Sequence, residues 1–258
     1  MGTDKLGDFT ELASDYARYR PGYSSTVLEA IVALLPQPAR ELDAVDIGAG
    51  TGIWTRQLAD QGLRTVTAVE PNDAMRHFGQ TGNQGRPITW LAGSAETTGL
   101  PDACCDLVTM ASSFHWANFE QACAEFYRLL RPGGLFVALW NTRIVTQSAL
   151  LERIEQRIRE LEPNLKRVSS GTSEFTSTLS ERLAAHDAWR EVRYLEGTHV
   201  EHQSPERYLG IWRSVNDIRV QLGPEKFQRF LDFVEHEVAA IEYVEASYRT
   251  RAWLAWRS

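Results

Sequence analysis

A dense group of glycines follows Asp46, in the sequence Asp-Ile-Gly-Ala-Gly-Thr-Gly that ends at Gly52. Glycines in such a loop permit unusual backbone angles and let a ligand approach the main chain closely. The carboxylate of Glu70, at the end of the next expected strand, can accept both hydroxyls of a ribose. A dinucleotide fingerprint would need a glycine where Ile53 stands. A tight turn uses the same residues, but the order of strand, loop, helix and strand favours a nucleoside site without a pyrophosphate.

Aromatic, histidine and arginine residues follow two further expected strands. His115 and Trp116 come after one strand, and Trp140, Asn141 and Arg143 end or follow the next. His115 is compatible with two roles, as a hydrogen-bond donor to an acceptor molecule or as its general base. The alternative is structural, with tryptophans at the rim of the sheet and a histidine that caps a turn.

Further cations lie late in the chain. Trp212 and Arg213 belong to one expected helix and Arg249 to the last expected strand, where they could bind an anionic substrate. A solvated arginine-rich surface is the alternative for each. His199 and His202 are three residues apart on an expected strand, so they face opposite sides and predict no metal site.

The elements that must position these residues alternate between strand and helix. The expected strands are 42–47, 64–70, 88–91, 106–111, 135–140, 191–200 and 243–256. The expected helices are 53–61, 72–78, 119–130, 205–215 and 224–241. This alternation predicts an α/β fold, a mostly parallel seven-stranded sheet with helices on both faces. Ligands bind beyond the carboxyl ends of such strands, where the chemistry-bearing residues above lie.

The regular alternation of strand and helix ends after residue 141. We expect one domain over 1–258, with a ligand-binding half over 1–142 and insertions at roughly 147–185 and 205–241 that form a helical cap. The Ser/Thr-rich stretch 169–180 predicts a mobile loop or lid.

Composition excludes several classes of protein. With 27 basic against 34 acidic residues the formal charge is −7, which argues against nucleic acid as the partner. No apolar run approaches the length of a signal core or of a membrane span, so we expect a cytoplasmic protein without membrane partners. Cys104, Cys105 and Cys123 form no CxxC pair, which disfavours zinc and disulfide frameworks. Monomer and homodimer stay open.

Six ordered segments resemble the class I S-adenosylmethionine-dependent methyltransferases, in the small-molecule branch that includes trans-aconitate-type enzymes. The segments are YARYRPGY at 16–23, VDIGAGTG at 45–52, AVEP at 68–71, GSAE at 93–96, LPDACCDLVTMASSFHW at 100–116 and LLRPGGLFVALWN at 129–141. The resemblance implies a Rossmann-like methyltransferase fold with S-adenosyl-L-methionine as cofactor and S-adenosyl-L-homocysteine as product.

The resemblance also implies residues that bind the cofactor. Asp46 and the glycines would line its methionine part, Glu70 would hold the ribose, and Arg20 would lie near the cofactor carboxylate. Ser94 and Glu96 would lie near the adenine, although the family usually has Asp in place of Ser94. The expected cofactor-binding set is Tyr16, Arg20, Asp46, Gly48, Ala49, Gly50, Gly52, Glu70, Pro71, Ser94, Ala95, Glu96, Ala111 and Ser112.

A small organic molecule is the expected methyl acceptor, through O-methylation of a carboxylate or an acidic hydroxyl. A carboxylate of pKa about 4 is ionised at neutral pH and needs only positioning, whereas a phenol of pKa about 10 would need His115 as base. N- or C-methylation and non-catalytic cofactor binding are the alternatives. The expected acceptor-binding set is Tyr23, His115, Trp116, Trp140, Asn141, Arg143, Trp212, Arg213 and Arg249, with His115 catalytic and no metal.

Overall fold

A single seven-stranded sheet organises the computed structural model, which describes residues 5–168 and 171–258. The strands are β1 Asp43–Ile47, β2 Thr65–Val69, β3 Ile88–Leu91, β4 Cys105–Ala111, β5 Leu130–Arg143, β6 Trp189–Gln203 and β7 Val244–Arg257. Their order is β3-β2-β1-β4-β5-β7-β6. Strands β1 to β5 are parallel, and β7 is antiparallel to both of its neighbours. The predicted α/β fold with a mostly parallel seven-stranded sheet is therefore confirmed.

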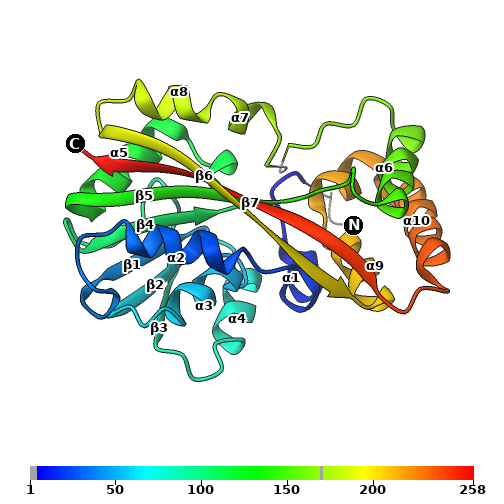
Figure 1. Cartoon of the computed structure of the whole chain (residues 1–258), viewed down its shortest axis with the longest axis horizontal. Helices are drawn as coiled ribbons and strands as arrows, with labels where there is room; N and C mark the ends of the chain where they lie inside the picture. The colour runs from blue at the N-terminus through cyan, green and yellow to red at the C-terminus, as the bar shows by residue number, and fades with distance from the viewer. Residues whose placement is uncertain (1–4, 169–170) are drawn as a thin grey trace.

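Helices connect the strands and build a separate layer at one end (Figure 1). The helices are α1 Ala13–Tyr19, α2 Ser25–Ala33, α3 Ile53–Ala59, α4 Asp73–Thr81, α5 Phe119–Leu129, α6 Ala149–Leu161, α7 Glu174–Ser177, α8 Leu179–Ala184, α9 Pro205–Arg213 and α10 Asn216–Val238. Asn72 caps α4, because its side chain accepts from the Met75 backbone N–H at 3.0 Å. None of the helices in the described ranges is long and apolar enough to span a membrane.

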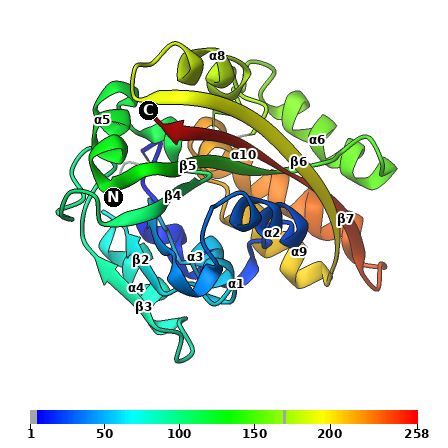
Figure 2. The ribbon, with the colours of Figure 1, turned by 60° about the vertical axis from the view of Figure 1, so that its left-hand side comes forward.

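Each face of the sheet buries its own apolar cluster. Helices α5 and α8 lie on one side and α2 and α3 on the other (Figure 2). On the α5 side, Phe126 and Phe136 are fully buried with ring centroids 4.7 Å apart. On the α2 side, Ile31 and Trp54 are buried against the same sheet. Burying each such side chain contributes about 1.5–3 kcal/mol, which explains why the strands read as apolar runs.

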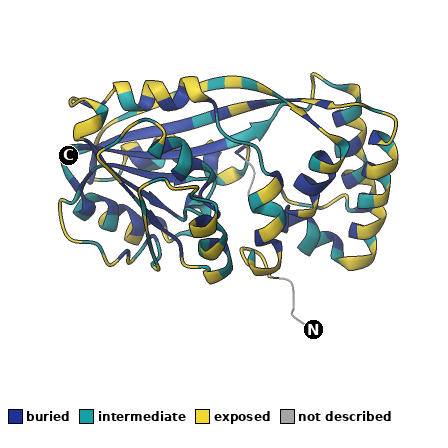
Figure 3. Cartoon of the chain, turned by 90° about the horizontal axis from the view of Figure 1, so that it is seen from below, coloured by how far each residue is buried: buried dark blue, intermediate teal, exposed yellow. Residues whose placement is uncertain are grey.

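A third cluster builds the cap from α6, α9 and α10. Trp212 and Phe230 meet edge to face at 5.0 Å in its centre. The cap helices turn their buried residues inward and their exposed residues toward the outer side (Figure 3). Strands β6 and β7 are long enough to run from the helix-covered sheet to the cap (Figure 1). Helix α10 contains a kink at Gly223, whose φ is +68°, directly before Pro224, where the sequence predicted the helix to begin.

Two expectations about the elements need correction. Residues 169 and 170 of the predicted mobile loop lie outside the described residues. From Gly171 onward the predicted loop is wrong, because it contains α7 and the start of α8, with Thr176 and Leu179 buried. The N-terminal helices α1 and α2 were not predicted from the sequence; α2 covers the same face of the sheet as α3, and α1 lies between the sheet and the cap (Figure 1).

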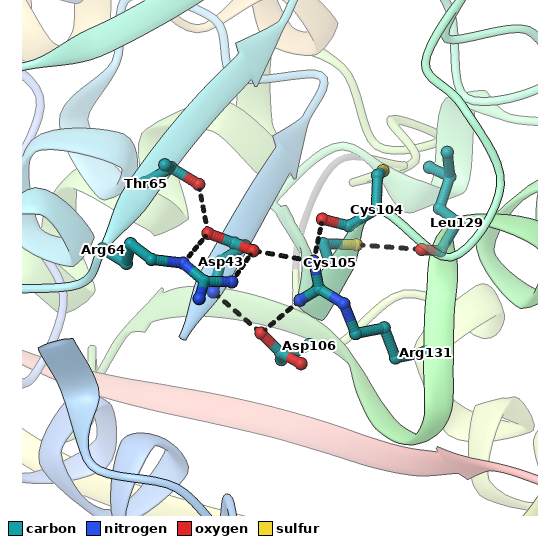
Figure 4. Close-up of polar contacts among 8 residues, drawn as sticks. All are labelled: Asp43, Arg64, Thr65, Cys104, Cys105, Asp106, Leu129 and Arg131. Carbon is teal, nitrogen blue, oxygen red and sulfur yellow. Dashed lines mark hydrogen bonds and ion pairs between the residues drawn. The ribbon is translucent and has the colours of Figure 1, made fainter. Parts of the chain in front are cut away.

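An ion-pair network fixes the opposite edge, where the strands begin (Figure 4). Asp43 accepts from Arg64 Nε at 2.8 Å and from Arg131 Nη2 at 2.8 Å. Arg131 also donates to Asp106 at 2.6 Å and to the Cys104 carbonyl at 2.9 Å. Hydrogen bonds from Arg64 hold the pKa of Asp43 well below its usual range. This edge is therefore stabilised by charge, while the opposite edge is left to bind ligands.

Candidate active site

A cavity of about 1150 Å³ lies between the carboxyl ends of the central strands and the cap. Strands β1 and β4 are neighbours, and the chain leaves them in opposite directions along the sheet, toward β2 and toward β5. This reversal of strand order is where α/β sheets bind ligands. The volume exceeds that of an ordinary single-ligand pocket, so a cofactor and a second molecule fit together.

The glycine loop forms one wall of the cavity. Gly48 and Gly50 have φ values of +62° and +57°, which side chains rarely adopt. A Cβ atom on Gly48 would lie 2.7 Å from Ser113 Oγ, so glycine is required there. The backbone consequently faces the cavity at Gly48, Ala49 and Gly50.

Glu70 lies beside this loop and is only 6% exposed. One carboxylate oxygen accepts from Gly50 N at 2.7 Å and the other from Asn72 N at 2.9 Å. Burial raises the pKa of Glu70, against the opposing effect of these N–H donors. Each oxygen keeps a further lone pair on the cavity side, which suits a vicinal diol.

Two residues of the expected cofactor set lie outside the cavity wall. Asp46 is fully buried and accepts from Thr55 at 2.5 Å and from Thr109 at 2.9 Å. Burial raises the pKa of Asp46 to about 7. Gly52 faces the Trp90 ring rather than the cavity. Asp46 therefore joins β1 to α3 and β4 beneath the loop instead of lining the ligand space.

The other expected cofactor residues lie together on the wall. The wall includes Tyr16, Arg20, Gly48, Ala49, Gly50, Glu70, Pro71, Ser94, Ala95, Glu96, Ala111 and Ser112. Arg20 donates from Nε and Nη2 to the hydroxyl and carbonyl of Ser214, both at 2.8 Å. Its guanidinium stacks 4.8 Å from the Tyr16 ring centroid. Partial burial raises the pKa of Glu96, but the Asn118 amide and the Ser94 hydroxyl outweigh it and lower the value overall.

His115 lies behind the cavity wall rather than on it. Its ring packs 4.4 Å from Trp116 and 6.1 Å from Trp140, and both ring nitrogens are buried without a hydrogen-bond partner. Burial lowers the pKa of His115 to about 4, although the charge of Asp217 opposes this. The imidazole is therefore neutral at physiological pH. Trp116 itself lines the cavity.

The acceptor side of the wall includes Tyr23, Trp116, Trp140, Asn141, Arg143 and Trp212. Asn141 is held in place, because it donates to the Gly22 carbonyl at 2.7 Å and accepts from Thr250 at 3.0 Å. The Tyr23 hydroxyl lies 3.0 Å from Ser112 Oγ. These contacts join the N-terminal segment to the ends of β4 and β5.

Two predicted cations lie elsewhere. Arg213 is exposed, and Arg249 lies 3.6 Å from Glu196 on β6; neither lines the cavity. The sequence analysis missed the wall formed by α6 and its neighbours. That wall contributes Glu152, Arg153, Glu155, Gln156, Arg159 and Arg167. The amphipathic pattern of α6 shows that one face is buried, but not that its polar face meets a cavity. Among the described residues no group of His, Cys, Asp or Glu is placed to hold a metal ion.

Comparisons with known proteins agree with this architecture. A family model described as a methyltransferase domain matches residues 45–138. An uncharacterized methyltransferase of Mycobacterium tuberculosis is 40% identical over 136 residues, which cover 52% of each chain. A malonyl-[acyl-carrier protein] O-methyltransferase of Geobacter sulfurreducens is 36% identical over 132 residues, 48% of each chain. The matched region thus spans about half the length of these curated relatives.

The fold match extends further than the sequence match. A solved structure from Anaeromyxobacter dehalogenans, named for a type II methyltransferase, superposes with a TM-score of 0.70 at 22% identity. It covers 93% of this chain and 98% of its own. The fold is therefore that of a Rossmann-like methyltransferase, and residues 45–138 match a methyltransferase domain. The cofactor that this family implies is S-adenosyl-L-methionine, and the glycine cradle and the buried Glu70 carboxylate fit it.

Proposed function

We propose that this protein transfers a methyl group from S-adenosyl-L-methionine to a small organic acceptor, by O-methylation of a carboxylate or an acidic hydroxyl. The observation that carries the proposal is one continuous cavity. It joins the glycine loop and Glu70 at one end to Trp140, Trp212 and Arg143 at the other. Donor and acceptor would therefore meet inside a single cavity between the sheet and the cap.

The sheet side would hold the cofactor. Glu70 would accept the ribose hydroxyls, and the backbone of Gly48 to Gly50 would pack against the methionine part. Arg20 has two guanidinium nitrogens engaged by Ser214, which leaves Nη1 for the cofactor carboxylate. When bound, the cofactor supplies an electrophilic methyl group on a sulfonium.

The cap side would position the acceptor and exclude water. Alignment of nucleophile, methyl group and sulfur supplies most of the catalysis in such a displacement. An ionised carboxylate needs no base, which agrees with a His115 that is buried behind Trp116. His115, expected from the sequence to be catalytic, would act as a positioning residue that orients Trp116 on the cavity wall. N- and C-methylation are the alternatives, and a small-molecule acceptor and cytoplasmic location stay predictions from composition.

Calorimetry and a turnover assay test this function. S-adenosyl-L-homocysteine should bind, and a panel of carboxylic acids, phenols and amines should reveal an acceptor that releases it from S-adenosyl-L-methionine. Binding without turnover on any acceptor would favour a non-catalytic binding protein. Binding of NAD in place of S-adenosyl-L-homocysteine would overturn the proposal. His115→Ala should lower turnover far more than cofactor binding, and equal effects would assign His115 a structural role.

A further inference from the structure

Arg143 is a buried cation on the cavity wall that forms no ion pair with a carboxylate of the described residues. It is the last residue of β5, and its guanidinium lies 4.4 Å from the Trp212 ring centroid and 5.2 Å from that of Tyr208. Its Nε is buried and has no hydrogen-bond partner. Across residues 5–168 and 171–258, no carboxylate forms an ion pair with it.

The other charged side chains near Arg143 on the cavity wall already have hydrogen-bond or ion-pair partners. Glu155 faces the same cavity, but its carboxylate accepts from Arg167 at 3.2 Å. Arg153 pairs with Glu237 at 2.8 Å, and Arg159 donates to Gln156 at 3.0 Å. Arg143 differs from these arginines because the acceptor found for it among the described residues is the neutral hydroxyl of Tyr248 rather than a carboxylate or an amide.

A desolvated cation is costly unless it is paired. Cation–π attraction to the rings of Tyr208 and Trp212 offsets part of this desolvation cost, by about 0.5–2 kcal/mol each. They offer no lone pairs in the plane of the guanidinium, however. The fork of N–H donors therefore lacks the acceptor that it fits best, a planar carboxylate bound through two oxygens.

Arg143 lies far along β5 from the glycine loop. A carboxylate bound to Arg143 would therefore be a different group from the one that is methylated beside that loop. Leu139 is in register with Ala111, and its carbonyl accepts from Ser112 N at 2.7 Å. Arg143 lies four residues further along β5, so its backbone is roughly 13 Å beyond that level at about 3.3 Å per residue. Figure 1 shows β5 continuing past the sheet toward α6 in this direction.

The wall between these two levels combines aromatic surface with a few polar groups. Trp140 and Trp212 supply the aromatic surface, and Asn141 and Thr142 are the polar members. A hydrocarbon or aromatic middle of a ligand would pack against the two tryptophans, because apolar surface gains free energy when it leaves water.

From this arrangement we infer that the methyl acceptor is an elongated organic acid with two functional ends. One end carries the oxygen that is methylated near Ser112, and the other carries a carboxylate held by Arg143, with an apolar segment between them. Arg143 is then the residue that selects this class of acceptor. A carboxylate fits better than a phosphate dianion, because one unpaired cation matches one negative charge. The inference rests on the proposed function, because it assigns the acceptor of that same site.

Matched probes test the inference in the full-length protein loaded with S-adenosyl-L-homocysteine. The probes are straight-chain ω-hydroxycarboxylates from butanoate to decanoate, together with their primary amides. At least one carboxylate should bind about tenfold or more tightly than its amide by calorimetry. Arg143→Gln should abolish that preference, and Arg213→Gln, an exposed control outside the cavity wall, should retain it. Arg143→Lys, which keeps the charge but not the fork, should show a reduced preference.

Each contrary result has a distinct meaning. Equal binding of carboxylates and amides, absence of binding by every probe, or an unchanged preference in Arg143→Gln would overturn the inference. S-adenosyl-L-homocysteine should bind within about twofold in every variant, which also shows that each variant is folded. Failure of S-adenosyl-L-homocysteine to bind the wild-type protein would instead overturn the proposed function.

Discussion

Glu70 combines two requirements in one carboxylate. Its oxygens hold the Gly50 and Asn72 backbone N–H groups, so it shapes the glycine loop. The same oxygens face the cavity, where a ribose would place its hydroxyls. Substitution of Glu70 should therefore disturb both the shape of the glycine loop and the binding of the ribose.

Glu70→Ala should therefore weaken S-adenosyl-L-homocysteine binding by about 1.5–3 kcal/mol, the usual loss for hydrogen bonds to a charged group. Calorimetry at neutral pH measures this directly. Glu41→Ala, at an exposed site, serves as the matched control and should bind normally. Unchanged affinity in Glu70→Ala would refute the ribose assignment.

Asp46 should make the stability of the protein depend on pH. Its pKa is raised by burial from 3.8 to about 7 in the folded state. Between these values the folded protein retains a proton that the unfolded chain releases, so this carboxyl makes stability fall as pH rises. Each pH unit in this window corresponds to about 1.4 kcal/mol.

Asp46→Asn should remove that dependence, because the amide does not titrate. The variant should gain free energy of unfolding relative to wild type between about pH 4 and pH 7, as measured by urea denaturation across the range. Asp187→Asn, at an exposed position, should leave the wild-type profile unchanged. A parallel profile for Asp46→Asn and wild type would show that Asp46 is ionised in the fold.

At the scale of elements, the sequence predicted the strands and the cap helices α9 and α10, but not the polar cavity face of α6. The apolar runs that became β1 and β4 were recognisable because both faces of these strands are buried. The glycine loop and Glu70 were located for the same reason, since strand ends define the ligand edge. The polar face of α6 and the helices α1 and α2 carry no such signal, because their roles arise from tertiary contacts. The ring of His115 likewise points behind Trp116, which spacing along a strand cannot show.

The edge where the strands begin depends on a network of charges. Arg131 joins Asp43 at the start of β1 to Asp106 on β4, and both carboxylates are largely buried. Arg131→Met would leave them with fewer donors, and should cost about 1–3 kcal/mol of unfolding free energy at pH 7. The loss should shrink as pH falls, because the pKa of Asp43 is held low only while its donors are present.

Urea denaturation at neutral and acidic pH checks this prediction. Arg40→Met provides the control, since Arg40 is exposed and contacts only its neighbour Glu41 among the ion pairs found. Its effect should be within about 0.5 kcal/mol at both pH values. A loss in Arg131→Met that is equally large in acid would mean that packing of the side chain, rather than its charge, stabilises this edge.

At the scale of the whole molecule, two units share the cavity. The sheet brings the glycine loop, Glu70 and the end of β4, and the cap brings Trp212 and the polar face of α6. Strands β5 and β7 extend through both units, so the ligand space is built on continuous hydrogen-bonded strands. The overall charge of −7 does not extend to the cavity, whose described wall has five arginines against four glutamates.

The N-terminal segment closes this space by contacting the far end of the chain. Asn216, at the start of α10, accepts from Gly7 N at 3.0 Å and donates to the Asp8 carbonyl at 2.8 Å and the Lys5 carbonyl at 3.2 Å. Gly7 and Phe9 line the cavity as a result. The side chain of Asn216 thus forms three hydrogen bonds with the N-terminal segment. Removing this side chain should make the segment open more readily.

Asn216→Ala should therefore accelerate release of S-adenosyl-L-homocysteine, by about tenfold if the lost hydrogen bonds together contribute about 1.4 kcal/mol to the closed state. Stopped-flow displacement measures the release rate, and thermal unfolding of the unliganded variant should show the accompanying loss of stability. Asn164→Ala, at an exposed site, should release the ligand at the wild-type rate. A folded Asn216→Ala protein with an unchanged release rate would mean that the ligand leaves by another route, past the cap rather than past the N-terminal segment.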